Sequence, residues 1–118
     1  MTLTTVAIAA VAVVGYLAYT KLSGSSAHAD PQTIRDKISA GATIVDVRTA
    51  AEFRAKSYPG AINIPVQELG SKLASLTKEK PVVLYCASGH RASLALKMLK
   101  QAGFIDVHNG GGLSQMPS

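Results

Sequence analysis

Short, β-branched apolar runs alternate along this chain with stretches of helical spacing, and this alternation constrains the fold more than any other feature. We expect four strands, at residues 43–47, 61–64, 82–85 and 105–108. Apolar residues in the stretches 66–76 and 91–102 recur at every third or fourth position, as on one face of a helix. Strands that alternate with helices form a parallel sheet covered on its faces. The sequence therefore predicts an α/β fold with a small parallel sheet flanked by helices.

Local signals indicate where the helices begin and end. Asp30 is a candidate N-cap and Pro31 fits the first position of a helix, so a short helix is expected to begin there. Thr49 and Glu52 have the separation of a capping box, which predicts the start of a second helix. Gly103 is expected to end the last helix. These signals agree with the alternating order of strands and helices.

The N-terminal segment differs in composition from the rest of the chain. Residues 2–20 hold no charged side chain, and their length suits a helix that crosses a bilayer. We therefore expect a transmembrane helix or uncleaved signal anchor at residues 1–22, a flexible linker at 23–30 and a globular domain at 31–118. Basic residues follow the span and none precedes it, which predicts a single-pass membrane protein with its domain in the cytoplasm.

A cleaved secretory signal is the alternative interpretation of this segment. Ala27-His28-Ala29, before Asp30, resembles an A-x-A processing site, and the strongest apolar stretch has about the length found in signal peptides. Against cleavage, residues 1–5 lack the basic side chains that usually begin a signal peptide. Cleavage after Ala29 would release the domain and make it secreted or periplasmic. Both interpretations remain open at this point.

Charge and cysteine content exclude several classes of protein. The chain of 118 residues carries 12 Lys and Arg against 7 Asp and Glu, a net charge of +5, but the basic residues are scattered and the aromatic residues are only four Tyr and two Phe. This composition favours a solvated basic surface over nucleic-acid binding, and it would attract a small anionic substrate. Cys86 is the only cysteine, so an internal disulfide and a second, resolving thiol are both excluded. The three histidines lack zinc-ligand spacing with Cys86.

Cys86 directly follows the expected strand 82–85, at the strand end where α/β folds bind ligands. A turn of small residues comes next and then the helix 91–102, so the sulfur would lie over a helix N-terminus whose N–H groups and dipole favour a thiolate. Gly89 permits a backbone twist that would point successive N–H groups inward as an anion-binding nest. Arg91, the sixth residue of the loop, adds a positive charge and paired donors. The sequence predicts a reactive cysteine beside an anion site.

Several short motifs follow one another along the chain. They are Asp46-Val47-Arg48, Glu52-Phe53, the runs at residues 59–65 and 83–92, and Gly110-Gly111-Gly112-Leu113. The ordered set, which spans residues 31–113, resembles the signatures of a single-domain rhodanese, a thiosulfate sulfurtransferase-like protein. The resemblance implies the rhodanese α/β fold and sulfurtransferase activity without a cofactor or metal. In that family a cysteine takes the outer sulfur of thiosulfate or a similar donor as a persulfide and passes it to cyanide or a thiol.

The resemblance also implies roles within the loop. By it, Cys86 is the nucleophile and persulfide carrier, the backbone from Ala87 to Arg91 cradles the substrate, and Arg91 steadies the donor anion. The substrate-binding residues are thus expected to be Ala87, Ser88, Gly89, His90 and Arg91. The interval from Cys86 to Arg91 has the six-residue length of the sulfurtransferase loop, whereas related phosphatases have a loop one residue longer.

Other functions and several individual roles remain open. The same cysteine could serve a phosphatase or an arsenate reductase, or the domain could be a non-catalytic module that recruits a partner or senses sulfide or persulfide at the membrane.

His90 either tunes the thiolate and contacts the acceptor or is simply exposed, and Asp46 and Arg48 form either a structural ion pair or a catalytic pair. Ser88 either donates its hydroxyl to the anion or is only small. Lys56-Ser57-Tyr58 stands where many relatives have Gly-His-Ile, so that histidine's polar contact is absent or replaced.

Overall fold

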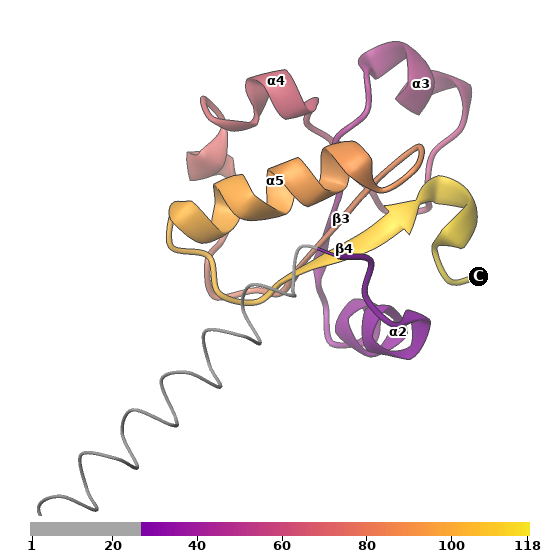
Figure 1. Ribbon diagram of the computed structural model, residues 1–118, viewed down its shortest axis with the longest axis horizontal. Helices are drawn as coiled ribbons and strands as arrows, with labels where there is room; N and C mark the ends of the chain where they lie inside the picture. Colours follow the sequence, from indigo (N-terminus) through magenta and orange to yellow (C-terminus); the bar gives the residue numbers. More distant parts are fainter. Residues whose placement is uncertain (1–26) are drawn as a thin grey trace, which may run out of the picture.

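A parallel β-sheet of four strands lies at the centre of the protein (Figure 1). The computed structural model describes residues 27–118. The strand order is β2-β1-β3-β4, and every neighbouring pair runs parallel. The strands are β1 Thr43–Asp46, β2 Ile62–Asn63, β3 Val82–Cys86 and β4 Val107–Gly112. The helices are α2 Pro31–Ser39, α3 Ala50–Ala55, α4 Val66–Leu69 and α5 His90–Gln101, with 3-10 turns η2 Leu73–Ser75 and η3 Leu113–Gln115. The predicted α/β fold, a small parallel sheet flanked by helices, is confirmed.

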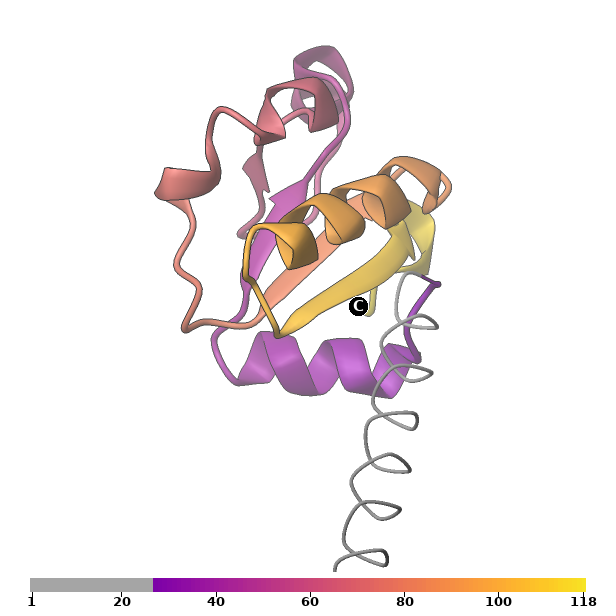
Figure 2. The same ribbon diagram turned by 60° about the vertical axis from the view of Figure 1, so that its left-hand side comes forward.

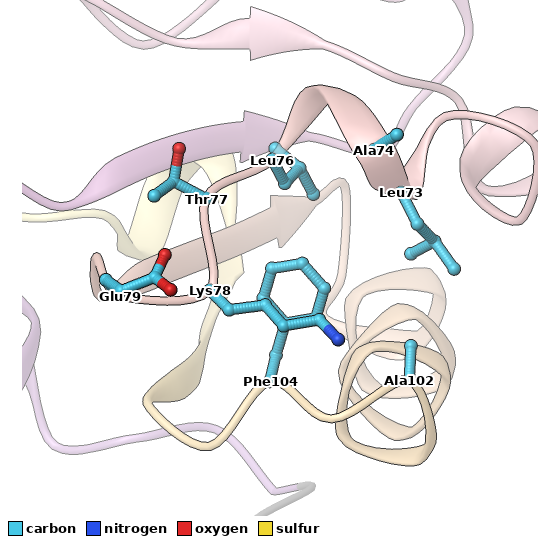
Figure 3. A pocket seen from close by; sticks show the side chains of 8 residues that line it. All are labelled: Leu73, Ala74, Leu76, Thr77, Lys78, Glu79, Ala102 and Phe104. Carbon is cyan, nitrogen blue, oxygen red and sulfur yellow. The ribbon is translucent and has the colours of Figure 1, made fainter.

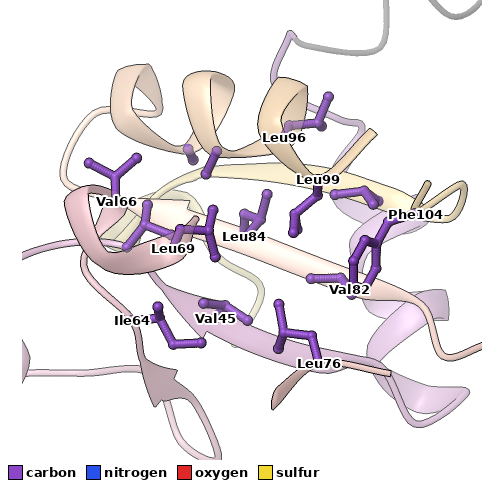
Figure 4. Close-up of a cluster of buried hydrophobic side chains, with 14 of the residues drawn as sticks. Val45, Ile64, Val66, Leu69, Leu76, Val82, Leu84, Leu96, Leu99 and Phe104 are labelled. Carbon is purple, nitrogen blue, oxygen red and sulfur yellow. The ribbon is translucent and has the colours of Figure 1, made fainter. Parts of the chain in front are cut away.

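Alternate side chains of the two central strands supply a separate core on each face of the sheet. Val45 and Leu84 pack with residues of α4 and α5 in one buried cluster (Figure 4). Val83 lies on the opposite face, in a second cluster to which α2 contributes Ile34. Figure 2 shows α5 and α2 on opposite sides of the sheet. Because side chains alternate along a strand, Cys86 falls on the same face as Leu84, in the cluster under α5.

The predicted helix starts agree with the structure. Pro31 lies in the first turn of α2, after the N-cap residue Asp30. The Thr49 hydroxyl accepts a hydrogen bond from the Glu52 N–H at 3.2 Å, and the Glu52 carboxylate accepts one from the Thr49 N–H at 3.0 Å. The capping box at the start of α3 is therefore complete. The helix α5 begins at His90, one residue earlier than its apolar spacing predicts.

The expected helix at residues 66–76 was wrong in its length. Helix α4 ends at Leu69, and only the short turn η2 follows it. The Ser71 N–H and hydroxyl both donate to the Glu68 carbonyl, at 3.1 and 2.9 Å, and this local bonding closes a turn where the helix would have continued. Leu69 and Leu76 are nevertheless both buried, so the helical spacing located core positions correctly.

The last strand is displaced toward the C-terminus relative to the predicted residues 105–108. Ile105 is 84% exposed in the connection before the strand, and β4 begins only at Val107. The strand then continues through the glycines to Gly112, which pairs with Cys86. Glycines disfavour strands in general, so their pairing here reflects a close approach of backbones that side chains would prevent.

Most of the N-terminal predictions fall outside the part of the chain that the structure describes. These are the transmembrane helix at 1–22 and the linker as far as residue 26. Within residues 27–118 no helix has the length and apolar character needed to cross a bilayer. The end of the expected linker is described: His28 forms a parallel bridge with Asn109, and the Ala29 N–H donates to the Asn109 carbonyl at 2.8 Å. This end of the linker lies along the outer edge of β4.

Candidate active site

The sulfur of Cys86 lies between the end of β3 and the start of α5. Its Sγ accepts hydrogen bonds from the Gly89 N–H at 2.9 Å and the Ala92 N–H at 3.4 Å. The cysteine itself is fully buried. Both donors belong to the first turn of α5 or its N-cap, where backbone N–H groups have no partner within the helix. Two fixed N–H donors stabilise negative charge on the sulfur.

Ala92 is a residue that the sequence analysis missed. The expected cradle ended at Arg91, but the second donor to the sulfur comes from the next residue. The orphan N–H groups of a helix extend through its first turn, and this rule, applied to a helix beginning at His90, would have included Ala92. Ala92 is also fully buried, so its position is set by core packing rather than by the loop.

Gly89 gives the loop its shape. Its φ of +93° lies in the left-handed region, which only glycine adopts readily. A Cβ at this position would lie 3.2 Å from the Cα of Gly111 in the neighbouring strand β4. The loop therefore packs directly against the glycines of β4, and a larger residue at position 89 would both strain the backbone and separate the two segments.

The side chain of Asn109 ties the loop to β4. Its Nδ2 donates to the Gly89 carbonyl at 3.1 Å, and its Oδ1 accepts from the Gly111 N–H at 2.8 Å. Asn109 is only 2% exposed. A buried asparagine inside a strand is unusual because asparagine favours turns, and its role was missed because the expected strand ended at residue 108.

The three consecutive glycines of β4 are explained by the same close packing. A Cβ on Gly112 would overlap the carbonyl oxygen of Ala87, and a Cβ on Gly110 would lie 2.5 Å from the Sδ of Met116. Gly112 lets β4 approach the loop that follows Cys86 without a side chain between them, whereas Gly110 leaves room for the side chain of Met116.

Arg91 is held by Glu52. Its Nη1 and Nη2 donate to the two carboxylate oxygens of Glu52 at 2.8 and 3.1 Å. These bonds from Arg91, together with the N–H of Thr49, lower the pKa of Glu52 to about 2. The hydrogen bonds to Glu52 are also the main cause of a raised pKa of Arg91, to which the electrostatic interaction with the nearby Cys86 adds a smaller contribution. A guanidinium has five N–H donors, and Glu52 engages two of them. Because Arg91 is 32% exposed, its remaining donors can bind an anion.

The remaining predicted loop residues lie on the outside of the loop. Ala87, Ser88 and His90 are exposed, whereas the two donors to the sulfur come from Gly89 and Ala92. The structure thus brings the backbone of the loop to Cys86 and leaves the Ser88 and His90 side chains toward solvent.

Asp46 and Arg48 form a buried ion pair at the end of β1. The Arg48 Nη2 lies 2.7 Å from Asp46 Oδ2 and also donates to the Lys56 carbonyl at 2.6 Å. The guanidinium sits 5.6 Å from the ring centre of Tyr85, and its hydrogen bond to Asp46 raises the pKa of Arg48. These contacts correspond to the structural alternative of the two that the sequence left open. The pair fixes the chain segment that leads to Lys56.

A cavity of about 460 Å³ opens beside the loop, where Ala87 forms part of its wall. Lys56 contributes positive charge, the Arg48 guanidinium in the wall is paired with Asp46, and no Asp or Glu side chain is among the described residues that line the cavity. Tyr58 shapes this wall: its N–H donates to the Tyr85 hydroxyl at 2.9 Å, and its own hydroxyl donates to the Pro117 carbonyl at 2.7 Å. The Lys56-Ser57-Tyr58 segment therefore makes polar contacts of its own.

A larger cavity, of about 550 Å³, lies at the other end of the sheet (Figure 3). It is lined by η2, by Ala102 at the end of α5 and by Phe104, whose ring centre lies 5.7 Å from the Lys78 Nζ. Because the strands are parallel, this end of the sheet is remote from the carboxyl end of β3, where Cys86 lies. Among residues 27–118 no cluster of three His, Cys, Asp or Glu side chains is arranged to bind a metal ion.

Residues 30–115 of this chain match the sequence model of the family described as "Rhodanese-like domain". The chain belongs to the rhodanese-like domain family. The thiosulfate sulfurtransferase PspE of Escherichia coli is 32% identical over 74 residues, which cover 61% of this chain and 71% of PspE. An HTH-type transcriptional regulator of Mycobacterium tuberculosis is 38% identical over 74 residues, and the match covers 61% of this chain but only 33% of that protein.

Solved structures of rhodaneses have the same fold. The structure described as rhodanese with anions from E. coli superposes with a TM-score of 0.61 at 32% identity, over 65% of this chain and 95% of that one. Relatives of this rhodanese-like domain therefore include named sulfurtransferases, both as a single short protein and as part of longer chains.

Proposed function

We propose that this protein is a sulfurtransferase that carries sulfur as a persulfide on Cys86. The observation that carries the proposal is the position of the Cys86 sulfur, which is held at the N-terminus of α5 by the N–H groups of Gly89 and Ala92. Backbone donors in that arrangement stabilise a thiolate and, after transfer, a persulfide anion, without a general base. Family membership and the named sulfurtransferase relatives support the same chemistry.

The proposed donor is thiosulfate or a similar sulfane-sulfur anion. The Cys86 thiolate attacks the outer sulfur of thiosulfate, so a new S–S bond forms while the old S–S bond breaks and its electron pair leaves with sulfite. In the second step a thiolate or cyanide attacks the outer sulfur of the persulfide, and the electron pair of that S–S bond returns to Cys86. The charge of Lys56 in the adjacent cavity, and the N–H donors of Arg91 that Glu52 does not engage, favour an anionic donor.

Sulfur loading of Cys86 tests this proposal directly. The purified protein is incubated with thiosulfate, and its intact mass and the released sulfite are measured. We expect one added sulfur atom per chain and one equivalent of released sulfite, both absent in Cys86→Ser. Cyanide or a thiol should then remove the added sulfur and restore the original mass. A chain that stays unmodified with several sulfane donors would contradict the proposal, and hydrolysis of an aryl phosphate under the same conditions would indicate a phosphatase instead.

We further propose that residues 1–22 anchor the protein in a membrane with its domain in the cytoplasm. The support is the uncharged span at residues 2–20 and the basic residues that follow it. N-terminal sequencing of protein from isolated membranes, followed by protease added from outside intact cells, tests both parts. A mature chain that begins at Asp30 would show cleavage after Ala29 and a secreted or periplasmic domain.

A further inference from the structure

Residues 28 and 29, at the candidate processing site, pair with the edge strand of the sheet. β4 is the last strand in the order, and its outer edge receives the bridge between His28 and Asn109. The Ala29 N–H completes the contact with a 2.8 Å hydrogen bond to the Asn109 carbonyl, and the Ala29 side chain packs against the core cluster under α2. The contact thus combines a backbone hydrogen bond with apolar packing.

Asn109 connects this pairing with the active-site loop. Its backbone accepts the N–H of Ala29, while its side chain holds the Gly89 carbonyl at 3.1 Å and the Gly111 N–H at 2.8 Å. Gly89 in turn donates its own N–H to the Cys86 sulfur at 2.9 Å. Three hydrogen-bonded steps therefore join Ala29 to the sulfur.

The ring of His28 makes a second connection. A Cβ on Gly111 would lie 2.7 Å from the His28 Cδ2, so the imidazole packs directly over that glycine. Gly111 is also the residue against which Gly89 packs, at 3.2 Å from the position of a Gly89 Cβ. The glycine is held between the histidine ring on one side and the loop on the other.

We propose that His28 and Ala29 are positioning residues of the sulfur-carrying loop, which they hold in place through Asn109 and Gly111. The proposal rests on the function proposed for Cys86. Cleavage after Ala29 would remove both contacts, so the processed domain would have a looser loop than the uncleaved chain. Cys86 is fully buried, and the freedom of this loop sets how readily a reagent or donor reaches the sulfur.

Ala29→Pro in the full-length chain removes the N–H that donates to Asn109. We expect alkylation of Cys86 by iodoacetamide to become about fivefold faster, the factor that corresponds to the net contribution of one hydrogen bond. Amide hydrogen exchange at Gly89 should accelerate by a similar factor, while the urea midpoint should fall by no more than the loss of one hydrogen bond explains, and exchange at Val45, in the sheet centre, should change no more than that fall predicts. The Gly89 amide proton should also shift in the NMR spectrum, because its bond to sulfur is altered. Ala27→Pro, in an exposed residue of the same segment, is the matched control that keeps the Ala29 N–H.

His28→Ala tests the second connection and decides the matter if the proline variant does not fold. Like Ala29→Pro, it should raise the rates of Cys86 alkylation and Gly89 amide exchange. The rate of sulfur transfer from thiosulfate to cyanide should also differ from that of the parent protein. Equal rates in the parent, Ala29→Pro and His28→Ala proteins would overturn the proposal, as would equal acceleration by Ala27→Pro and Ala29→Pro. Faster alkylation in a protein that never acquires sulfur from thiosulfate would instead refute the proposed function and leave the positioning role standing.

Discussion

Replacing Glu52 with glutamine isolates the ion pair that holds Arg91. The change removes the negative charge from the pair, yet glutamine at this position can still complete the capping box with Thr49. The pKa of Glu52 falls from 4.5 to about 2 in the folded protein, chiefly through its hydrogen bond from Arg91. That shift corresponds to at most roughly 3 kcal/mol of stability. Because the two side chains are 32% and 34% exposed, solvent screening reduces the expected loss in Glu52→Gln to about 1 kcal/mol at pH 7.

The pH dependence of this loss provides the decisive measurement. The folded-state pKa of Glu52 lies below its ordinary 4.5, so the stabilisation is complete above pH 4.5 and is lost as the pH falls through about 2. Urea unfolding of the parent and Glu52→Gln proteins, at several pH values from 7 down to 2, should therefore show a difference that shrinks toward zero. Glu68→Gln breaks an exposed pair with Lys72 and should change stability by no more than about 0.5 kcal/mol. A difference for Glu52→Gln that is the same at pH 7 and pH 2.5, or absent at pH 7, would refute the reasoning.

Two further substitutions test the packing around the site. Gly112→Ala should lower the free energy of unfolding in urea by about 2 kcal/mol and slow sulfur loading, because the new Cβ would overlap the Ala87 carbonyl. Gly41→Ala is the control: Gly41 has a φ of +92° and no atom within 4 Å of the new Cβ, so the loss should be only about 1 kcal/mol. Arg48→Met should cost about 3–5 kcal/mol by the same assay, because it leaves the Asp46 carboxylate buried without the guanidinium that pairs with it. A cost under about 1 kcal/mol would contradict a stabilising role for this ion pair.

The sequence predicted the features that depend on neighbouring residues. The β-branched runs, the capping box at Thr49 and the position of Cys86 between a strand and a helix are all local patterns, and the structure contains each of them. The length of α4 could not be predicted from apolar spacing, because Ser71 bonds to the Glu68 carbonyl while the spacing of core residues continues unchanged.

The contacts that join distant parts of the chain could not be predicted in the same way. Arg91 and Glu52 are 39 residues apart, and their pairing depends on how α3 is placed over the loop. Asn109 lies 20 residues from Gly89 and reaches it only because β4 pairs with β3. Such contacts follow from the strand order, which periodicity alone does not determine.

The two outer strands of the sheet also affect whether copies of the domain aggregate. Unpaired strand edges are templates for association between copies, and long, flat edges are the most hazardous. β2 has only two residues, which gives a very short edge. The outer edge of β4 is already occupied at Asn109 by the pairing of His28, and its remaining length is rich in glycine. Loss of that pairing would expose backbone N–H and C=O groups, so a chain cut after Ala29 should aggregate more readily on gentle heating than the intact one.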